Sequence, residues 1–456
     1  MNPADSLDAP RPSLLAAFVG ELAERLAAGE VGFVRLGEPT ASAALHAFRE
    51  LVTQARTEPS GLSDLAAAEL VQLAVLGQQF DVLARHDLPT FGYRYLDTYE
   101  EAVEFGPPRT QAETSFRPHE TELLGRTLRT PIGIGSSVLT ASPEFVLHFA
   151  RNGYSLLTYK TMRTRKVDAY LAPNWTFVAE TELPADESFV PTRVVTELAT
   201  LPKSLRHTST VNSFGLPSPA PDEWQPDVRR TLDNLPSGCL LAVSVVGSFD
   251  LYQHERFKED FVLAVRLAVE AGAEVVELNL SCPNVLKDSE NRDTGGLLCE
   301  DVPSVTRVVD RIRTAFPDIK LIAKLGLMDH ELLREFTASC GPLLDAVAAI
   351  NSVRVEVLDS SREPLFPGSE RDPDLRREAG LSGSAVRGAG LGATADLRRF
   401  REEDDRLDFE IVGTGGVLTE DDYDAYRRAG ADFVQAVTGA FVNPSLARQV
   451  CAALGE

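Results

Sequence analysis

Residues 275–284 read Val275-Val-Glu-Leu-Asn-Leu-Ser-Cys-Pro-Asn284, a short apolar run that ends in polar residues. A helical pattern precedes this stretch over Phe257–Ala271, and another follows it over Val302–Phe316. A short, nearly continuous apolar run between two helices is typical of a strand buried in a parallel sheet. The stretch therefore predicts one β/α unit, with its polar side chains at the carboxyl end of the strand.

The same pattern recurs along most of the chain. Seven further apolar runs are Pro131–Gly135, Ser155–Lys160, Leu240–Val246, Lys320–Leu325, Ala346–Ile350, Phe409–Val412 and Phe433–Val437. Further helical segments are Pro143–Asn152, Asp329–Ala338, Ala393–Glu402 and Glu420–Ala429. Eight buried strands alternating with helices predict a (β/α)₈ TIM barrel over residues 120–456. A doubly wound sheet is the rival architecture, and the count of eight favours the barrel.

The first hundred residues have a different character. Residues 1–12 are rich in acids and prolines and are expected to be a disordered lead. Apolar residues then recur at helical spacing, which predicts a helical extension over 13–110. A membrane-docking helix is disfavoured, because such helices prefer Lys and Arg on their polar face. Dimerisation and covering of the active-site mouth remain alternative roles for this extension.

Composition excludes several classes of protein. The 45 Lys and Arg residues stand against 68 Asp and Glu residues, and the net charge of −23 disfavours a nucleic-acid partner. No apolar run approaches the ~18 residues of a membrane span. The five cysteines are scattered, without the pairs that bind zinc or iron–sulfur clusters. We therefore expect a cytoplasmic protein that binds a small molecule and has no metal site.

Polar residues follow the predicted strands where a barrel places its active site. Lysines close two strands, at Lys160 and Lys324, where each is either a surface residue or a cation in the site. Cys282 lies in a loop, either as a small buried hydrophobe or as a nucleophile or base. Four asparagines stand at the starts of predicted loops, where an amide either caps a turn or hydrogen-bonds a planar polar substrate. They are Asn212, Asn279, Asn284 and Asn351.

Glycines and small polar residues mark the remaining strand ends. They are Gly135, Ser136, Thr161, Ser352, Gly383, Gly413, Gly415, Gly416, Thr438 and Gly439. Loops after the seventh and eighth strands are the usual phosphate site of a barrel, because their backbone N–H groups approach an anion closely. Plain turns are the alternative, and two such loops together favour a phosphate.

Several of these segments resemble dihydroorotate dehydrogenases. They are Glu277–Asn284, Asn212–Pro217, Lys160-Thr161, Ala379–Gly383 and Val412–Val417. The resemblance extends from about Leu128 to the C-terminus, with the motifs in the family's order. It implies an FMN-binding barrel that oxidises (S)-dihydroorotate to orotate in pyrimidine biosynthesis. A base removes the proton from C5 of the substrate, and a hydride passes from C6 to flavin N5.

The same resemblance implies roles for single residues. Cys282 would be the base, as in the soluble class 1 enzymes, and Lys160 would contact both flavin and substrate. Substrate contacts are implied for Asn212, Gly215, Leu216, Asn279, Asn284, Asn351 and Ser352. Lys324 would contact the flavin, and glycines and a threonine would line its phosphate, at Gly383, Gly415, Gly416 and Thr438. The electron acceptor is left open, and a homodimer is common in the family.

The sequence departs from the family pattern at several positions, among them Ile134–Ser137, Val437–Gly439 and two places near the expected substrate pocket. A loop that usually ends in arginine is replaced by Asp168–Trp175, which has no arginine. Arg354 follows Asn351-Ser352, where a small or apolar residue is expected. Three other functions therefore stay under consideration. The protein could oxidise another dihydropyrimidine or cyclic amide or acid, or it could be a non-catalytic FMN scaffold. It could also reduce tRNA uridines, which the acidity of the chain disfavours.

Overall fold

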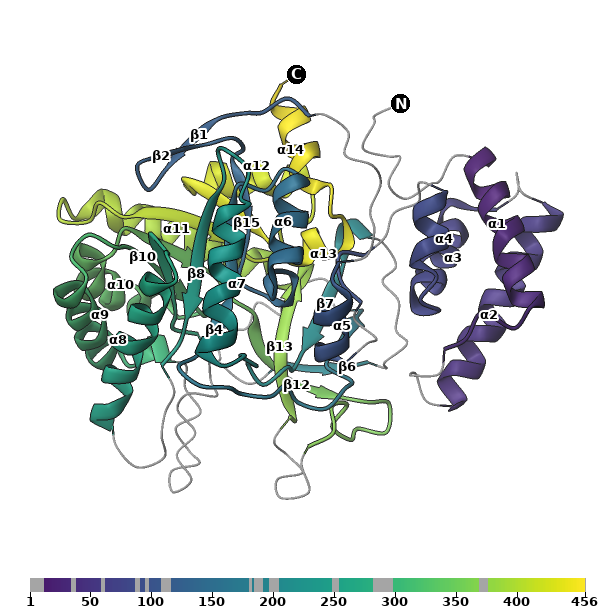
Figure 1. The fold of residues 1–456 in the computed structure, drawn as a ribbon, viewed down its shortest axis with the longest axis horizontal. Helices are drawn as coiled ribbons and strands as arrows, with labels where there is room; N and C mark the ends of the chain where they lie inside the picture. The colour runs from purple at the N-terminus through teal and green to yellow at the C-terminus, as the bar shows by residue number, and fades with distance from the viewer. Residues whose placement is uncertain are drawn as a thin grey trace.

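The computed structural model contains a closed barrel of parallel strands with helices around it (Figure 1). The structure describes residues 12–33, 38–58, 62–86, 91–94, 98–107, 116–179, 183, 192–196, 205–247, 254–281, 298–368 and 376–455. The barrel strands, in spatial order, are β3 (Ile132–Ile134), β4 (Leu156–Met162), β8 (Leu240–Val245), β9 (Val275–Asn279), β10 (Lys320–Leu325), β11 (Ala346–Ala349), β14 (Glu410–Thr414) and β15 (Phe433–Ala436). These are the eight predicted runs, so the (β/α)₈ prediction is confirmed.

A helix follows each barrel strand and covers the outer surface of the barrel. In chain order the helices are α6 (Pro143–Arg151), α7 (Pro221–Asp233), α8 (His254–Glu270), α9 (Val302–Ala315), α10 (His330–Cys340), α11 (Arg387–Glu403), α12 (Glu420–Ala429) and α14 (Leu446–Leu454). In α9, buried side chains at Val302, Val305, Val309 and Ile312 recur at helical spacing and face the strands. Burial of such stripes closes the core between the helices and the barrel.

A short hairpin closes the amino-terminal end of the barrel. Its strands β1 (Thr121–Leu123) and β2 (Arg126–Leu128) pair antiparallel. Leu123 and Leu128 pack with interior side chains of the barrel, including Leu156 and Val275. Catalytic residues of such a barrel therefore have access to solvent only at the opposite, carboxyl end.

A second sheet stands at the carboxyl end and was not predicted. Its strands, in spatial order, are β5 (Trp175–Val178), β7 (Ser209–Asn212), β13 (Glu378–Gly383), β12 (Val353–Leu358) and β6 (Thr192–Val195). The pairs are antiparallel except for β12 with β6. We call it the mouth sheet. It carries Trp175, Asn212 and Gly383 to the rim of the barrel.

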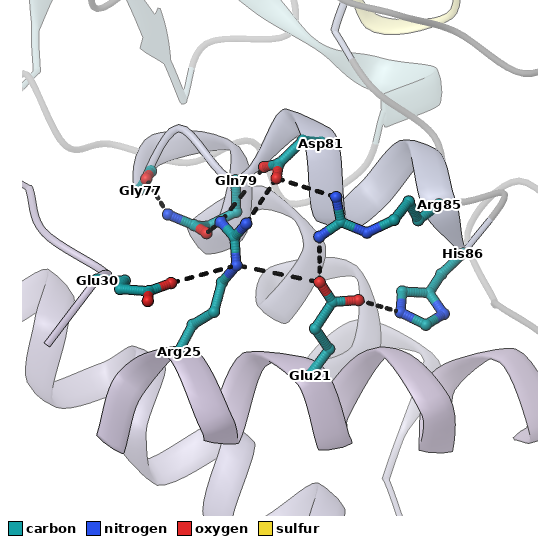
Figure 2. A network of polar contacts seen from close by, with 8 residues as sticks. All are labelled: Glu21, Arg25, Glu30, Gly77, Gln79, Asp81, Arg85 and His86. Carbon is teal, nitrogen blue, oxygen red and sulfur yellow. Dashed lines mark hydrogen bonds and ion pairs between the residues drawn. The ribbon is translucent and has the colours of Figure 1, made fainter. Parts of the chain in front are cut away.

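The N-terminal helices α1 (Pro12–Ala27), α2 (Glu38–Thr57), α3 (Asp64–Leu76) and α4 (Phe80–Arg85) group to one side of the barrel (Figure 1). An ion network joins α1 to α4 (Figure 2). Arg25 Nη2 lies 2.6 Å from Asp81 Oδ2, and Arg85 and His86 both bind Glu21. The hydrogen bond from Arg85 holds the pKa of Glu21 below its ordinary value. Within the described chain, no helix is long and apolar enough to cross a membrane.

Substitution of Gly133 in β3 tests how closely the strands of the barrel pack. A Cβ at this position would lie 2.4 Å from Leu156 O and 2.8 Å from Leu156 Cβ. We expect Gly133→Ala to lower the free energy of unfolding by about 1–3 kcal/mol, because the added methyl overpacks the interior. Gly392 of α11 has no atom within 4 Å of such a Cβ. Gly392→Ala should raise the free energy of unfolding by about 0.5–1 kcal/mol. Urea titration of both variants measures the two changes. Equal stability of both variants would contradict this account of closure.

Candidate functional site

A cavity of about 290 Å³ opens at the carboxyl ends of the barrel strands, below the mouth sheet. Most residues predicted to form the site line it. They are Ser136, Lys160, Thr161, Asn212, Gly215, Leu216, Asn279, Lys324, Asn351, Ser352, Gly383, Gly415, Gly416 and Thr438. These residues come from segments more than 250 positions apart in the chain, and the barrel brings them together.

Three predicted glycines are not part of this lining. A Cβ on Gly413 would come 2.5 Å from Cδ1 of Tyr426, and a Cβ on Gly439 would come 2.1 Å from Val417 O. Both glycines therefore allow close packing at the edge of the site, and their assignment as cofactor contacts stays a prediction. Gly135 borders the site, because its Cβ would lie 3.4 Å from Lys324 Nζ. Cys282 and Asn284 lie outside the described residues.

A chain of hydrogen bonds crosses the cavity floor. Asn279 Nδ2 donates to Thr161 Oγ1 over 3.0 Å, and Ser281 Oγ donates to Asn279 Oδ1 over 2.9 Å. Asn351 Nδ2 in turn donates to Ser281 Oγ over 2.5 Å. The hydroxyl of Thr161 also contacts that of Ser136 at 3.0 Å. These bonds fix the amides of Asn279 and Asn351 together with Ser281, which precedes Cys282 in the sequence.

The mouth sheet positions a third amide. Asn212 is the last residue of β7, and its Nδ2 donates to Gly380 O over 3.3 Å. Gly380 leaves room for Ser352, because a Cβ at Gly380 would lie 2.5 Å from Ser352 Oγ. The backbone N–H of Ser352 donates to Asn351 Oδ1 over 2.9 Å. Asn212 and Asn351 therefore approach the cavity from two different sheets.

Two buried lysines face the same cavity. Lys160 is 5% exposed and Lys324 is 3% exposed. Lys324 has no hydrogen-bond or ion-pair partner in the part of the chain that the structure describes. Trp175 Nε1 and Thr210 Oγ1, on two other lining residues, are buried donors that also lack a partner there. Buried donors of this kind are matched by acceptors in most proteins, so the wall suits a ligand rich in acceptor atoms.

One end of the cavity is made of glycine backbone. Gly383, Gly415 and Gly416 adopt positive φ angles of 88°, 113° and 73°. A Cβ on Gly416 would lie 2.6 Å from Gly383 O, so the two loops approach closely. Thr438 lines the same cavity at the start of α13 (Thr438–Val442). Exposed N–H groups of such loops bind phosphate.

Arg376 is a residue of the site region that sequence analysis missed. Its guanidinium is buried and donates to the backbone oxygens of Leu171, Pro173 and Ser213, each over 2.7 Å. It also lies 5.3 Å from the ring centre of Tyr170, which lines the cavity. Burial lowers the pKa of Arg376 to about 10. A guanidinium from a distant segment therefore holds the loop 168–175, which lacks an arginine of its own.

Glu277 is a second unexpected residue. It is fully buried on β9, and neither carboxylate oxygen has a partner among the described residues. Alternation along the strand places it on the same face as Asn279, inside the barrel beneath the cavity. The sequence contains a signal that could have identified Glu277, since an acid in an otherwise apolar strand is uncommon. No group of three or more His, Cys, Asp or Glu suited to a metal occurs in the described parts of the chain.

Comparisons with known proteins agree with this geometry. The family model described as Dihydroorotate dehydrogenase matches residues 199–456. A dihydroorotate dehydrogenase of Dictyostelium discoideum is 28% identical over 336 residues, covering 72% of this chain and 85% of the relative. A dihydroorotate dehydrogenase B (NAD(+)) catalytic subunit of Methanocaldococcus jannaschii is 26% identical over 236 residues, covering 51% of this chain and 66% of the relative.

A solved structure shares the fold. It is the crystal structure of DHODH in complex with ferulenol from Eimeria tenella, with a TM-score of 0.53 and 17% identity. The match covers 74% of this chain and 83% of that one. At this identity the similarity supports only the barrel fold, and the assignment to a family rests on the family model. The chain belongs to the dihydroorotate dehydrogenase family of flavin-dependent oxidoreductases that act on CH–CH groups.

Proposed function

We propose that this protein oxidises (S)-dihydroorotate to orotate, with FMN as its resident cofactor and Cys282 as the base. The observation that carries the proposal is the convergence of two buried lysines and three amides on one cavity that Ser281 also lines. The names of the relatives support the same substrate. The reaction belongs to pyrimidine biosynthesis.

The cavity fits FMN at both of its ends. Lys324, Trp175 and Thr210 present buried donors to the carbonyl and nitrogen acceptors of a flavin ring, and Gly383, Gly415 and Gly416 suit its phosphate. Bound FMN would supply the acceptor for the hydride from C6 of the substrate. The Lys324 ammonium would hold the ring and would favour negative charge there.

The amides and Lys160 suit the substrate. Lys160 supplies a cation for the substrate carboxylate, and an amide offers both a donor and an acceptor to the ring C=O and N–H groups. The amides assigned to this contact are Asn212, Asn279, Asn284 and Asn351. Gly215, Leu216 and Ser352 shape the same part of the wall. These contacts orient C5 and C6 of the substrate.

Cys282 is the candidate base by its resemblance to the class 1 enzymes, and the other thiols are unsuited to the task. Burial raises the pKa of Cys239, Cys340 and Cys451 to about 11 and that of Cys299 to about 12. Thiols of such high pKa are inert at neutral pH. Cys282 follows Ser281, which two hydrogen bonds tie to the site. The thiolate of Cys282 would take the proton from C5.

A different cyclic substrate is the second candidate, and one feature favours it. Arg354 and Glu378 both line the cavity, and their charged groups lie 3.6 Å apart. This pair adds a cation and an anion to the rim, which suits a substituent larger than the one carboxylate of dihydroorotate. The reaction class is unchanged under this alternative.

Flavin reduction under anaerobic conditions tests the proposal. We expect the purified protein to show a flavin spectrum that bleaches within the mixing time when dihydroorotate is added. A flavin spectrum that stays unchanged with dihydroorotate but bleaches with another dihydropyrimidine would favour the second candidate. A protein that neither contains nor takes up FMN would refute the cofactor assignment.

Replacement of Cys282 tests the base. Cys282→Ala should keep its flavin and lose about 10²–10⁴-fold in the rate of flavin reduction, the usual contribution of a general base. Cys239→Ala is the matched control, because Cys239 lies before β8 at the end of the barrel opposite the cavity. Stopped-flow absorbance gives both rates. Normal reduction in Cys282→Ala would reject the assignment.

Replacement of Lys324 tests flavin binding in an experiment that needs no catalytic turnover. Lys324→Met should weaken FMN binding to apoprotein about 10- to 150-fold, since a charged hydrogen bond is worth roughly 1.5–3 kcal/mol. Lys320→Met is the control on the same strand, where Lys320 Nζ binds Asp345 at 2.8 Å. Fluorescence titration measures both constants. An unchanged Kd in Lys324→Met places the flavin elsewhere.

A further inference from the structure

The end of the N-terminal extension is joined to the wall of the cavity. Gly92 N donates to Phe441 O over 2.6 Å, and the ring of Phe91 lies 4.9 Å from that of Phe441. Tyr93 lies 5.8 Å from the ring of Trp175, a cavity residue. Residues 91–94 therefore pack as part of the barrel mouth, although they precede the first barrel strand by about forty residues.

Helix α5 (Tyr99–Phe105) continues this contact. Thr98 caps its first turn, because Thr98 Oγ1 accepts from Glu101 N and the Glu101 carboxylate accepts from Thr98 N. The cap fixes where the first helical residue points. Tyr99 is 8% exposed, and its ring lies 6.1 Å from that of Phe214, which lines the cavity.

The ring of Tyr99 also faces a charged residue of the site. Lys160 Nζ lies 5.9 Å from the centre of this ring. The face of an aromatic ring attracts an ammonium without competing for the ammonium's hydrogen bonds. Burial keeps the pKa of the Tyr99 phenol well above its ordinary value, so the side chain stays neutral. The ring therefore acts on Lys160 as a neutral cover.

We propose that Tyr99 of the N-terminal extension is a positioning residue of the active site, which covers the Lys160 ammonium and holds it toward the substrate's anionic group. The identity of that group rests on the proposed function, whereas the placement of Tyr99 over Lys160 does not. The extension thereby contributes to the site in the same chain, in addition to its own helical core.

The test compares three variants of the full-length holoenzyme. Tyr99→Leu removes the ring and keeps an apolar side chain, and Tyr99→Phe keeps the ring. Tyr154→Leu is the matched packing control. Like Tyr99, Tyr154 is a buried tyrosine in edge contact with a phenylalanine, and it precedes β4 at the end opposite Lys160. Two readouts are measured: KM and kcat for dihydroorotate, and the rate at which acetic anhydride labels Lys160 relative to Lys320.

We expect Tyr99→Leu to raise KM about 5- to 30-fold, the factor that a desolvated cation–π contact corresponds to. Labelling of Lys160 should become faster in this variant. Tyr99→Phe and Tyr154→Leu should match the wild type in both readouts, even where Tyr154→Leu loses stability. Unchanged KM and labelling in Tyr99→Leu would overturn the proposal and leave Tyr99 as a packing residue.

The two readouts separate this inference from the proposed function. If dihydroorotate fails to reduce the wild-type flavin, the proposed substrate is wrong, and the labelling comparison still decides whether Tyr99 covers Lys160. If Tyr99→Leu and Tyr154→Leu speed labelling equally, the effect is general loosening and the positioning role is rejected.

Discussion

Closure of the barrel through the pairing of β15 with β3 is the constraint on which the site depends. All eight strands run parallel, so their carboxyl ends meet at one rim only when the sheet closes. Lys160 on β4 and Lys324 on β10 are separated by two strands in the sheet, and both face one cavity across the barrel. Gly133 lets β3 fit between both of its neighbours, since a side chain there would meet the backbone of Leu156 on β4 and the ring of Phe433 on β15.

The mouth sheet turns this rim into a defined pocket. It brings Asn212 from β7 and Gly383 from β13 over the barrel, and Arg376 ties the loop 168–175 to Ser213 beside it. The donors of Arg376 satisfy carbonyl groups that loops of this kind otherwise leave to water. A polar wall built from three distant segments is thereby held in one arrangement, which substrate orientation requires.

The barrel could be predicted because buried parallel strands leave continuous apolar runs, and Lys320–Leu325 and Glu420–Ala429 have the predicted bounds. The mouth sheet could not, because its strands lie in the connections between barrel strands, outside the repeating β/α pattern, and the pairs β12–β6 and β13–β7 join segments more than 150 residues apart. At Gly413 and Gly439 the sequence cannot separate ligand approach from tight packing, because a glycine serves both, and the structure shows the tight packing. Arg376 and Tyr99 act through contacts across more than 60 residues, which no local pattern records.

The charges of the molecule explain which ligands reach this site. The chain carries −23 overall, yet its cavity contains two buried lysines from opposite sides of the barrel. Under the proposed function, the Lys324 ammonium would face the flavin ring and the Lys160 ammonium the substrate carboxylate, while the glycine loops would hold the flavin phosphate. The two cations would thereby attract small anionic ligands that the overall acidity of the chain repels.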